Sequence, residues 1–478
     1  MSRFRFVGLL VMTILPAAGC ARTSPAPGSA PSPAGQEAFL DTLEERTFRW
    51  FWETTNPANG LVPDRWPTPS FSSVAAVGFG LTSYAVGVER GWVTREQAAE
   101  RTLATLRFFW RAPQGPETSG VTGHRGFFYH FLDMRTGRRF EQVELSTIDT
   151  GLLMLGVLAA AEYFDRGDAR EAEIRALADS LYRRVDWAWA ASPRAPLISM
   201  GWHPEPGRGF IPHDYRGYNE AMFLYVLALG SPTHPVEPAA WAAYTGTYRW
   251  ADFHGQEHVN FAPLFGHQYS HAWIDFRGIR DAYMRERGID YFENSRRATL
   301  AQRAYAIANP MGWKGYGPDL WGLTASDGPK DTVVVIDGRP RQLWTYRARG
   351  AAAGEVQDDG TLVPTAAGGS VPFAPEVAVP ALMEMRRRFG ENLFTRYGFL
   401  DAFNPTLTEP MPLQHGRIVP GVGWFDGDYL GIDQGPIVLM VENHRSGLVW
   451  RLMRDNPYIV RGLCRAGFTG GWLEGRCG

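Results

Sequence analysis

The sequence predicts one large, mostly helical domain over residues 37–478, within the all-α class. Apolar residues recur at helical spacing in roughly ten to twelve segments. Neither regular alternation of strands and helices nor a short tandem repeat appears among these segments. The most apolar segments follow loops rich in glycine, aromatic and acidic residues, which fits helix pairs closed into a ring with the loops meeting at one end.

The first twenty residues have the features of an export signal. Arg3 and Arg5 precede an apolar stretch over residues 6–15, which is too short to cross a membrane as a folded helix. The residues before Cys20, Ala-Ala-Gly, resemble the bacterial lipoprotein cleavage box, in which the cysteine becomes the lipidated first residue. Cleavage nearby by an ordinary signal peptidase is the alternative. We therefore expect an exported protein in the periplasm or at the outer membrane, with a lipid anchor on Cys20.

Residues 21–36 predict an extended, mobile tether. They consist mainly of proline, serine, alanine and glycine, a composition that cannot form a core. A lipid anchor followed by a short tether is a coherent arrangement.

Helical periodicity places the main elements in order along the remaining chain. Thr94 begins one helix as an N-cap, with Gln97 three residues later as in a capping box. The other predicted helices span residues 39–54, 73–90, 146–164, 170–191, 218–229, 270–287, 291–308, 375–389 and 433–454. Short strands are predicted near residues 126–129, and a hairpin over residues 332–346 turns at Asp337-Gly338.

Two cysteines, Cys464 and Cys477, lie near the C-terminus. In an exported protein we expect a disulfide between them, with two free thiols as the alternative. No histidine lies beside them, so a metal site is not expected there.

Charge and composition narrow the function classes. The net charge is -2, which gives no electrostatic reason to expect a nucleic-acid partner or binding to an anionic membrane surface. The sequence has 17 Trp and 18 Tyr, many of them in loops beside glycine and aspartate, where such rings suit either a core or a ligand surface. The sequence has neither a phosphate-binding loop nor a Gly-x-Ser-x-Gly elbow.

Acidic residues lie at the N-terminal ends of three predicted apolar helices. Glu220 precedes a nearly wholly apolar run, where burial would raise its pKa and hold a proton for a leaving group. Glu144 and Asp149 flank the start of another apolar helix, and Asp433 lies at the head of a third. Helix capping accounts for Glu144 and Asp433 equally well, and less well for Asp149, which has apolar neighbours.

Three further segments combine aromatic and polar residues. The i, i+4 pair His267 and His271 suits a metal, but no third ligand is evident, so we expect no metal and read these histidines as contacts to sugar hydroxyls or as packing. Residues 309–328 form a long loop of the kind that is often functional. The side chains expected to bind substrate are Gln268 and Tyr269 beside the histidines, Trp313, Tyr316, Trp321 and Asp327 in the long loop, and Trp424 and Asp428 before the last apolar helix.

Several of these segments together resemble the bacterial glycoamylase-like family, whose members form glycoside hydrolase family 144. The resemblance covers nearly all of residues 37–478. The motifs that carry it are Ser-Thr-Ile-Asp-Thr-Gly at 146–151, Tyr-Asn-Glu-Ala-Met at 218–222, Phe-Gly-His-Gln-Tyr-Ser-His at 265–271, Gly-Pro-Asp-Leu-Trp-Gly-Leu-Thr-Ala-Ser-Asp at 317–327, Pro-Thr-Ala-Ala-Gly-Gly-Ser-Val-Pro-Phe-Ala-Pro-Glu at 364–376 and Tyr-Leu-Gly-Ile-Asp-Gln-Gly-Pro at 429–436.

The resemblance implies an (α/α)6 barrel that hydrolyses β-1,2-linked glucan with inversion. It implies that Glu220 is the general acid. For the general base, Asp433 is the first choice, and Asp149 or Glu144 the second. No cofactor is expected, and the protein should act as a monomer on a β-glucan substrate. The segment over residues 330–359 is longer than the family pattern leads us to expect. It would reshape one end of the cleft, so endo and exo action both stay open.

Two other classes of function remain as alternatives. One is an enzyme of the same fold that acts on another linkage, or a polysaccharide lyase that would use Tyr or His. The other is a surface lipoprotein that binds glycan without cleaving it. Acids buried at several helix mouths argue against binding alone, because binding does not require them.

Overall fold

The computed structural model of the protein describes residues 32–477. The predicted export signal, Cys20 and most of the predicted tether lie outside these residues. The tether was expected to reach residue 36, but helix α1 (Pro33–Thr54) already begins at Pro33. The Ser32 side chain accepts a hydrogen bond from the Gly35 backbone, and proline suits the first helical position, so residues 33–36 are helical.

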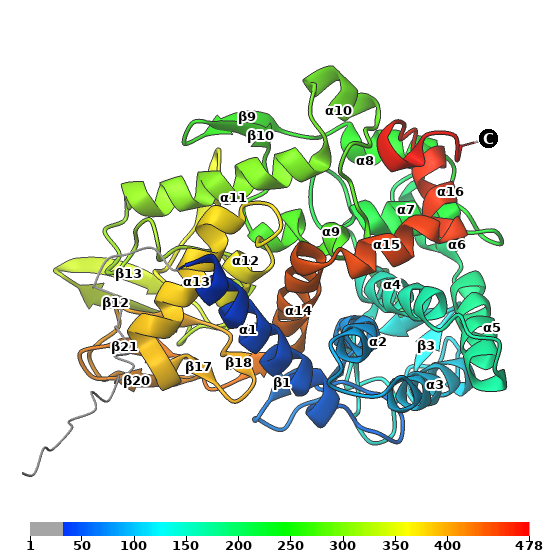
Figure 1. The fold of residues 1–478 in the computed structure, drawn as a ribbon, viewed down its shortest axis with the longest axis horizontal. Helices are drawn as coiled ribbons and strands as arrows, with labels where there is room; N and C mark the ends of the chain where they lie inside the picture. Colours follow the sequence, from blue (N-terminus) through cyan, green and yellow to red (C-terminus); the bar gives the residue numbers. More distant parts are fainter. Residues whose placement is uncertain (1–31, 478) are drawn as a thin grey trace, which may run out of the picture.

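Helices dominate the described residues, and Figure 1 shows their arrangement. After α1, the helices are α2 (Val74–Glu89), α3 (Arg95–Arg111), α4 (Thr147–Tyr163), α5 (Ala169–Arg184), α6 (Trp187–Ala191), α7 (Met222–Gly230), α8 (Ala239–Thr245), α9 (Tyr269–Trp273), α10 (Ala282–Arg287), α11 (Tyr291–Ala308), α12 (Pro364–Gly368), α13 (Pro375–Phe389), α14 (Gly431–Arg445), α15 (Leu448–Asp455) and α16 (Pro457–Arg465).

Six helices form an inner set. Nearly all residues of α2, α4, α7, α9, α12 and α14 are buried, as expected for helices that are apolar on most sides. Their packing links α2 to α4, α4 to α7, α7 to α9, α9 to α14, α12 to α14, and α14 back to α2. In Figure 1, α14 lies near the middle of the molecule, with α1 beside it.

Small residues allow the closest crossing in this set. A Cβ atom on Gly156 of α4 would lie 2.2 Å from the backbone oxygen of Gly78 of α2, so the two helices approach backbone to backbone. One continuous core joins side chains from Phe39 to Leu473, and its inner helices set the positions of the loops that precede them.

The strands are short and lie in the loops. The largest sheet has the order β3 (Gly123–His124), β4 (Phe127–Tyr129), β6 (Leu145–Ser146), β7 (Gly201–His203), β8 (Gly209–Phe210). The other pairings are β1 (Arg65–Trp66) with β22 (Tyr429–Leu430), β2 (Ser72–Ser73) with β5 (Phe131–Leu132), β9 (Trp250–Phe253) with β10 (Gln256–Val259), β11 (Ala325–Ser326) with β14 (Arg347–Ala348), β12 (Thr332–Ile336) with β13 (Arg339–Leu343), β15 (Gly350–Ala352) with β16 (Glu355–Gln357), β17 (Phe394–Thr395) with β18 (Gly398–Phe399), and β21 (Gly423–Phe425) between β19 (Phe403–Asn404) and β20 (Arg417–Val419).

Several local predictions are confirmed. The capping box of Thr94 and Gln97 is present, and the β12–β13 hairpin turns at Asp337-Gly338, both of which have positive φ. Cys464 and Cys477 form a disulfide bond. None of the helices within residues 32–477 is both long and apolar enough to span a membrane.

Three predicted helices are interrupted. Residues 170–191 divide into α5 and α6, because Asp186 caps a new helix by accepting from Trp189 N–H. Residues 270–287 divide into α9 and α10 around Gly278, and residues 433–454 divide into α14 and α15 at Gly447. Both glycines have positive φ, which a continuous helix cannot contain.

Candidate active site

Glu220 lies in the turn directly before α7, where the sequence had predicted the first helical turn. Ser270 of α9 holds this turn in place. Its Oγ donates to the backbone oxygen of Glu220 at 2.9 Å and accepts from the backbone N–H of Phe223 at 3.0 Å. Two segments that are distant in the sequence therefore fix the backbone that carries the carboxylate.

The surroundings of Glu220 favour its protonated form. The side chain retains partial solvent contact, yet protein encloses most of it. Burial raises the pKa of Glu220 to about 7, and the negative charge of Asp149 adds to the rise, while a backbone hydrogen bond opposes it. A carboxylic acid with such a pKa can hold a proton near neutral pH and release it to a developing alkoxide.

His130 joins two of the predicted acids into one group. It follows β4, and the pairing of β4 with β6 brings its backbone N–H to the Glu144 backbone oxygen at 3.0 Å. Its Nδ1 lies 2.7 Å from Glu144 Oε1 and its Nε2 lies 3.6 Å from Asp149 Oδ1. Asp149 also contacts the hydroxyl of Ser146, the N-cap of α4.

The charges in this group support one another. Burial lowers the pKa of His130, but Asp149 and Glu144 outweigh it and raise the value to about 9, so the imidazole is a cation at neutral pH. Burial raises the pKa of Glu144, but the hydrogen bond and the charge of His130 outweigh it and bring the value to about 2. Glu144 is therefore an ionised partner of His130, and its basicity is low.

Asp433 belongs to a second acidic group, at the start of α14. It lies in the first turn of α14, whose N-cap is Leu430, so Asp433 does not act as the cap. The group also contains Asp327, Asp401 and Asp426, all buried. Asp401 Oδ2 accepts from the backbone N–H of Asp327 at 2.8 Å, and one carboxylate oxygen of Asp433 has no hydrogen-bond partner within residues 32–477.

Strand pairing assembles the second group. Asp64 precedes β1 and accepts a backbone hydrogen bond from Gly431, two residues before Asp433, at 2.8 Å. Arg65 reaches Asp327 Oδ2 at 2.5 Å and supplies positive charge. Burial raises the pKa of Asp433 to about 7, a hydrogen bond from Asp401 lowers it, and the charges of Asp327 and Asp64 raise it.

Three carboxylates of this group could be considered as metal ligands. One oxygen from each of Asp327, Asp401 and Asp426 lies within 4.8 Å of the others, a donor set that suits a hard cation. The Arg65 guanidinium already pairs with Asp327. The positive charge beside these carboxylates is therefore supplied by an arginine of the protein.

Tyr269 links the two acidic groups. It is buried on α9 against Phe79 and Phe265. Burial raises its pKa well above the ordinary value, and Asp433, Glu220 and Asp149 are among the charges that raise it further. Carboxylates of both groups therefore lie within electrostatic reach of one phenol, which places Glu220 and Asp433 around a common region.

Tyr346, which belongs to the segment 330–359, lies beside the second acidic group. Ser326 pairs with Arg347 at the end of the antiparallel β11–β14 ladder, and Asp327 and Tyr346 are the residues next to this pair. The side chain is 53% exposed and makes neither a hydrogen bond nor a ring contact with the residues that the structure describes. Partial burial, then the charges of Asp433 and Asp401, raise its pKa well above the ordinary value.

The residues predicted to bind substrate differ in their positions and contacts in the structure. Tyr269 and Asp327 are part of the site described above. Tyr316 donates its hydroxyl to Asp358 at 2.7 Å, and Asp428 accepts from the backbone N–H of Thr68 at 2.9 Å, so both have structural partners. The remaining six are almost fully buried within the protein: His267, Gln268, His271, Trp313, Trp321 and Trp424.

The sugar contacts expected of these six side chains stay predictions, and the structure shows contacts within the protein. His267 Nε2 lies 3.1 Å from the Phe261 backbone oxygen, and His271 Nε2 lies 3.1 Å from Ser295 Oγ. Burial lowers the pKa of both histidines, so they are neutral core residues. The i, i+4 spacing of the pair therefore reflects packing, and the large loop over residues 309–328 is anchored by its own buried tryptophans.

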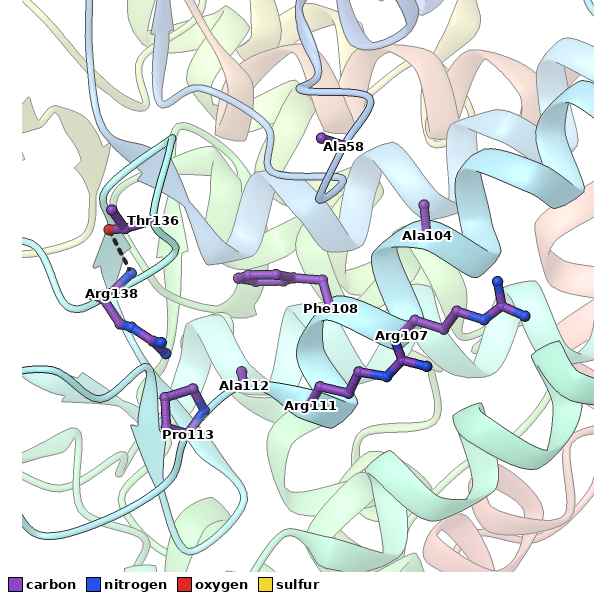
Figure 2. A pocket seen from close by; sticks show the side chains of 9 residues that line it. All are labelled: Ala58, Ala104, Arg107, Phe108, Arg111, Ala112, Pro113, Thr136 and Arg138. Atoms are coloured by element: carbon purple, nitrogen blue, oxygen red, sulfur yellow. Dashed lines mark hydrogen bonds between the residues drawn. The ribbon is translucent and has the colours of Figure 1, made fainter.

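A hollow of about 400 Å³ lies elsewhere, along α3 and the loops beside it. Figure 2 shows that its lining includes Arg107, Arg111 and Arg138 around Phe108. Neither an acid described above nor a residue bonded to one lines it, and Arg107 is already paired with Glu173. It is therefore separate from the acidic site.

Known proteins that resemble this chain include some described as glucoamylases or glucanases. The family model described as "Putative glucoamylase" matches residues 212–457, more than half of the chain. A crystal structure with the same description from Bacteroides uniformis is 32% identical, with a TM-score of 0.77, and the match covers 92% of this chain and 99% of that one. The endo-β-1,2-glucanase from Chitinophaga pinensis, solved with sophorotriose and glucose, is 29% identical with a TM-score of 0.77, again over 92% and 99% of the two chains.

One curated relative is longer than this chain. The exo-β-1,2-glucooligosaccharide sophorohydrolase (non-reducing end) of Parabacteroides distasonis is 30% identical over 463 residues. The match covers 90% of this chain but 58% of the relative, so this chain spans less than two thirds of the relative's length.

Proposed function

The chain belongs to the glycoamylase-like family described as putative glucoamylases, and on that premise we propose that it is a glycoside hydrolase that cleaves β-1,2-linked glucan. The observation that carries the proposal is Glu220, a carboxyl group with a pKa raised to about 7 whose charge, like that of Asp433, acts on Tyr269. Hydrolysis of a glycosidic bond requires two carboxyl groups, one that donates a proton to the leaving oxygen and one that accepts a proton from water.

In this mechanism Glu220 protonates the glycosidic oxygen as the bond to the anomeric carbon breaks. The alkoxide that would otherwise leave is thereby neutralised, and the fixed turn around Glu220 and Ser270 holds the acid in one position. The cationic His130 lies between Glu144 and Asp149 and partly offsets their negative charges beside Glu220.

Asp433 is the preferred general base. One of its carboxylate oxygens is buried without a hydrogen-bond partner in the described residues, so it is available to accept a proton from water. Glu144 is a weaker candidate because His130 brings its pKa to about 2, and Asp149 is occupied by Ser146 and His130. In an inverting enzyme the two carboxyl groups would lie roughly 6.5–9.5 Å apart, which leaves room for that water.

The proposed architecture is the (α/α)6 barrel. Five of the buried helices, α2, α4, α7, α9 and α14, pack in a closed cycle, α12 packs on α14, and the site acids precede or begin three of these helices. This supports an inner ring whose loops converge at the site. An enzyme of this kind can act as a monomer, exported and anchored by lipid through Cys20, as the N-terminal sequence predicts.

The substrate class is tested by incubating the protein with β-1,2-glucan, β-1,3-glucan, β-1,4-glucan and starch, followed by chromatography of the products. We expect sophoro-oligosaccharides from β-1,2-glucan and no release from the others. Cleavage of another glucan alone would overturn the substrate assignment, and a product that absorbs in the ultraviolet would indicate a lyase.

The stereochemical outcome is tested by proton NMR of fresh product. The account predicts the α-anomer at the newly formed reducing end. The β-anomer would mean retention and would overturn the roles of Asp433 and water.

A further inference from the structure

A second hollow, of about 260 Å³, begins at the residue next to Glu220. Asn219, which is peptide-bonded to Glu220, lines one wall, with Thr247 and Arg249 beside it. Phe261 lines another, and Ala353 and Glu355 line the outer wall. The outer wall comes from the β15–β16 hairpin, in the segment that is longer than the family pattern predicts.

Hydrogen bonds within the protein hold the walls of this pocket in place. Asn260 accepts from the backbone N–H of Ala353 at 2.9 Å and donates to the backbone oxygen of Ala251 at 2.9 Å. The Asn219 side chain accepts from the backbone N–H of Ala221 at 3.0 Å. Asn260 therefore joins the β15–β16 hairpin to β9, and Asn219 stabilises the turn that carries Glu220.

Two charged side chains of the pocket are left without partners. The side chains of Arg249 and Glu355 are exposed and make neither a hydrogen bond nor an ion pair within residues 32–477. A guanidinium offers only donors and a carboxylate only acceptors, and together they match the hydroxyl groups of a neutral sugar, which both donate and accept. The Phe261 ring supplies an apolar surface for the pyranose face.

We propose that this pocket is a subsite for one glucosyl unit of the β-1,2-glucan chain whose scissile bond lies at Glu220. Its volume is below the roughly 300–1,000 Å³ typical of whole small-molecule sites, so it fits one sugar unit better than an oligosaccharide. The position of Asn219 places this unit on the acid side of the scissile bond. The β15–β16 hairpin then determines how far the glucan chain extends in that direction.

This inference rests on the proposed function and is tested by the length of the substrate. Arg249→Ala is measured against Arg287→Ala, which removes an exposed arginine that lies over Trp250 and Tyr283, outside the pocket lining. For oligosaccharides long enough to reach the pocket we expect kcat/KM of Arg249→Ala to fall roughly tenfold, mainly through KM. The loss should shrink as the oligosaccharide is shortened, and Arg287→Ala should behave like the wild type.

Two results would overturn the subsite while leaving the hydrolase intact: an equal loss at every length, or no loss at any length. If the wild-type protein releases no sugar from β-1,2-glucan, the proposed function fails separately. Calorimetric binding of sophoro-oligosaccharides to the wild type and to Arg249→Ala then decides the subsite. Weaker binding in the variant supports the subsite, and equal or absent binding removes it.

Discussion

The hydroxyl of Ser270 donates a 2.9 Å hydrogen bond to the backbone oxygen of Glu220. The same hydroxyl accepts from Phe223 at the start of α7, so one side chain of α9 fixes both the turn and the helix that follows it. This contact assigns Ser270 a positioning role, because it sets where the Glu220 carboxyl group can point.

Replacing Ser270 should therefore affect turnover more than binding. In Ser270→Ala the turn loses its anchor, and we expect kcat to fall roughly ten- to a hundredfold with little change in KM, since small misplacements of an acid are costly. Ser270→Thr keeps the hydroxyl and should recover most of the activity. A loss confined to KM, or a threonine variant no better than alanine, would contradict the positioning role.

The raised pKa of Glu220 predicts a pH-dependent stability. The folded chain holds a proton on this group up to about pH 7, whereas the ordinary value is 4.5. The contribution to stability is therefore complete below pH 4.5 and is lost as the pH rises through about 7. Glu220→Gln cannot ionise, so its stability relative to the wild type should increase by about 2 kcal/mol between roughly pH 5 and pH 9.

Thermal or denaturant unfolding across that pH range measures the difference. Glu257→Gln, at the exposed residue of β10, is the control, and its difference from the wild type should stay constant. A constant difference for Glu220→Gln as well would show that the carboxyl group is not held protonated by its surroundings.

Tyr346 should contribute to substrate binding. Its half-exposed ring lies free of ring contacts beside the second acidic group, a placement that suits stacking on a sugar face. For Tyr346→Ala we expect KM to rise about fivefold to tenfold with a smaller change in kcat, whereas Tyr346→Phe should keep most of the affinity. Trp110→Ala, at another exposed aromatic residue, is the control. An unchanged KM in Tyr346→Ala would exclude the contact.

Arg349 should be necessary for stability. It is fully buried and pairs with Asp359 at 2.8 Å. It also donates to the backbone oxygens of Ser326 and Trp344, which joins the hairpin segment to the loop of the second acidic group. Arg349→Met leaves Asp359 buried and unpaired and should lower the free energy of unfolding by roughly 3–5 kcal/mol. Urea denaturation measures this, with exposed Arg347→Met as the control, and equal effects of the two variants would contradict the role of Arg349.

The sequence alone located the acids because each precedes or begins an unmistakably apolar helix. Glu220 and Asp433 could be found in this way, and so could Asp149 at the head of α4. The main helices could also be placed, except where Gly278 and Gly447 interrupt them with positive φ and where Asp186 caps a new helix.

The partners of these acids could not be predicted, because pairing between short, distant strands brings them in. The pairing of β4 with β6 brings His130 to Glu144, and the pairing of β11 with β14 ends at the residues next to Asp327 and Tyr346. Strands of two or three residues have no periodicity that a sequence reveals. The spacing of His267 and His271 is visible in the sequence, but their complete burial is not, and that burial favours the packing alternative.

The most direct test of the account is the turnover of Glu220→Gln on β-1,2-glucan, measured beside its circular dichroism spectrum. The amide keeps the size of the side chain but cannot donate the required proton. We predict that kcat falls by about 10²–10⁴-fold while the helical spectrum is unchanged. Turnover near that of the wild type would contradict the assignment of Glu220 as the acid that cleaves the glycosidic bond.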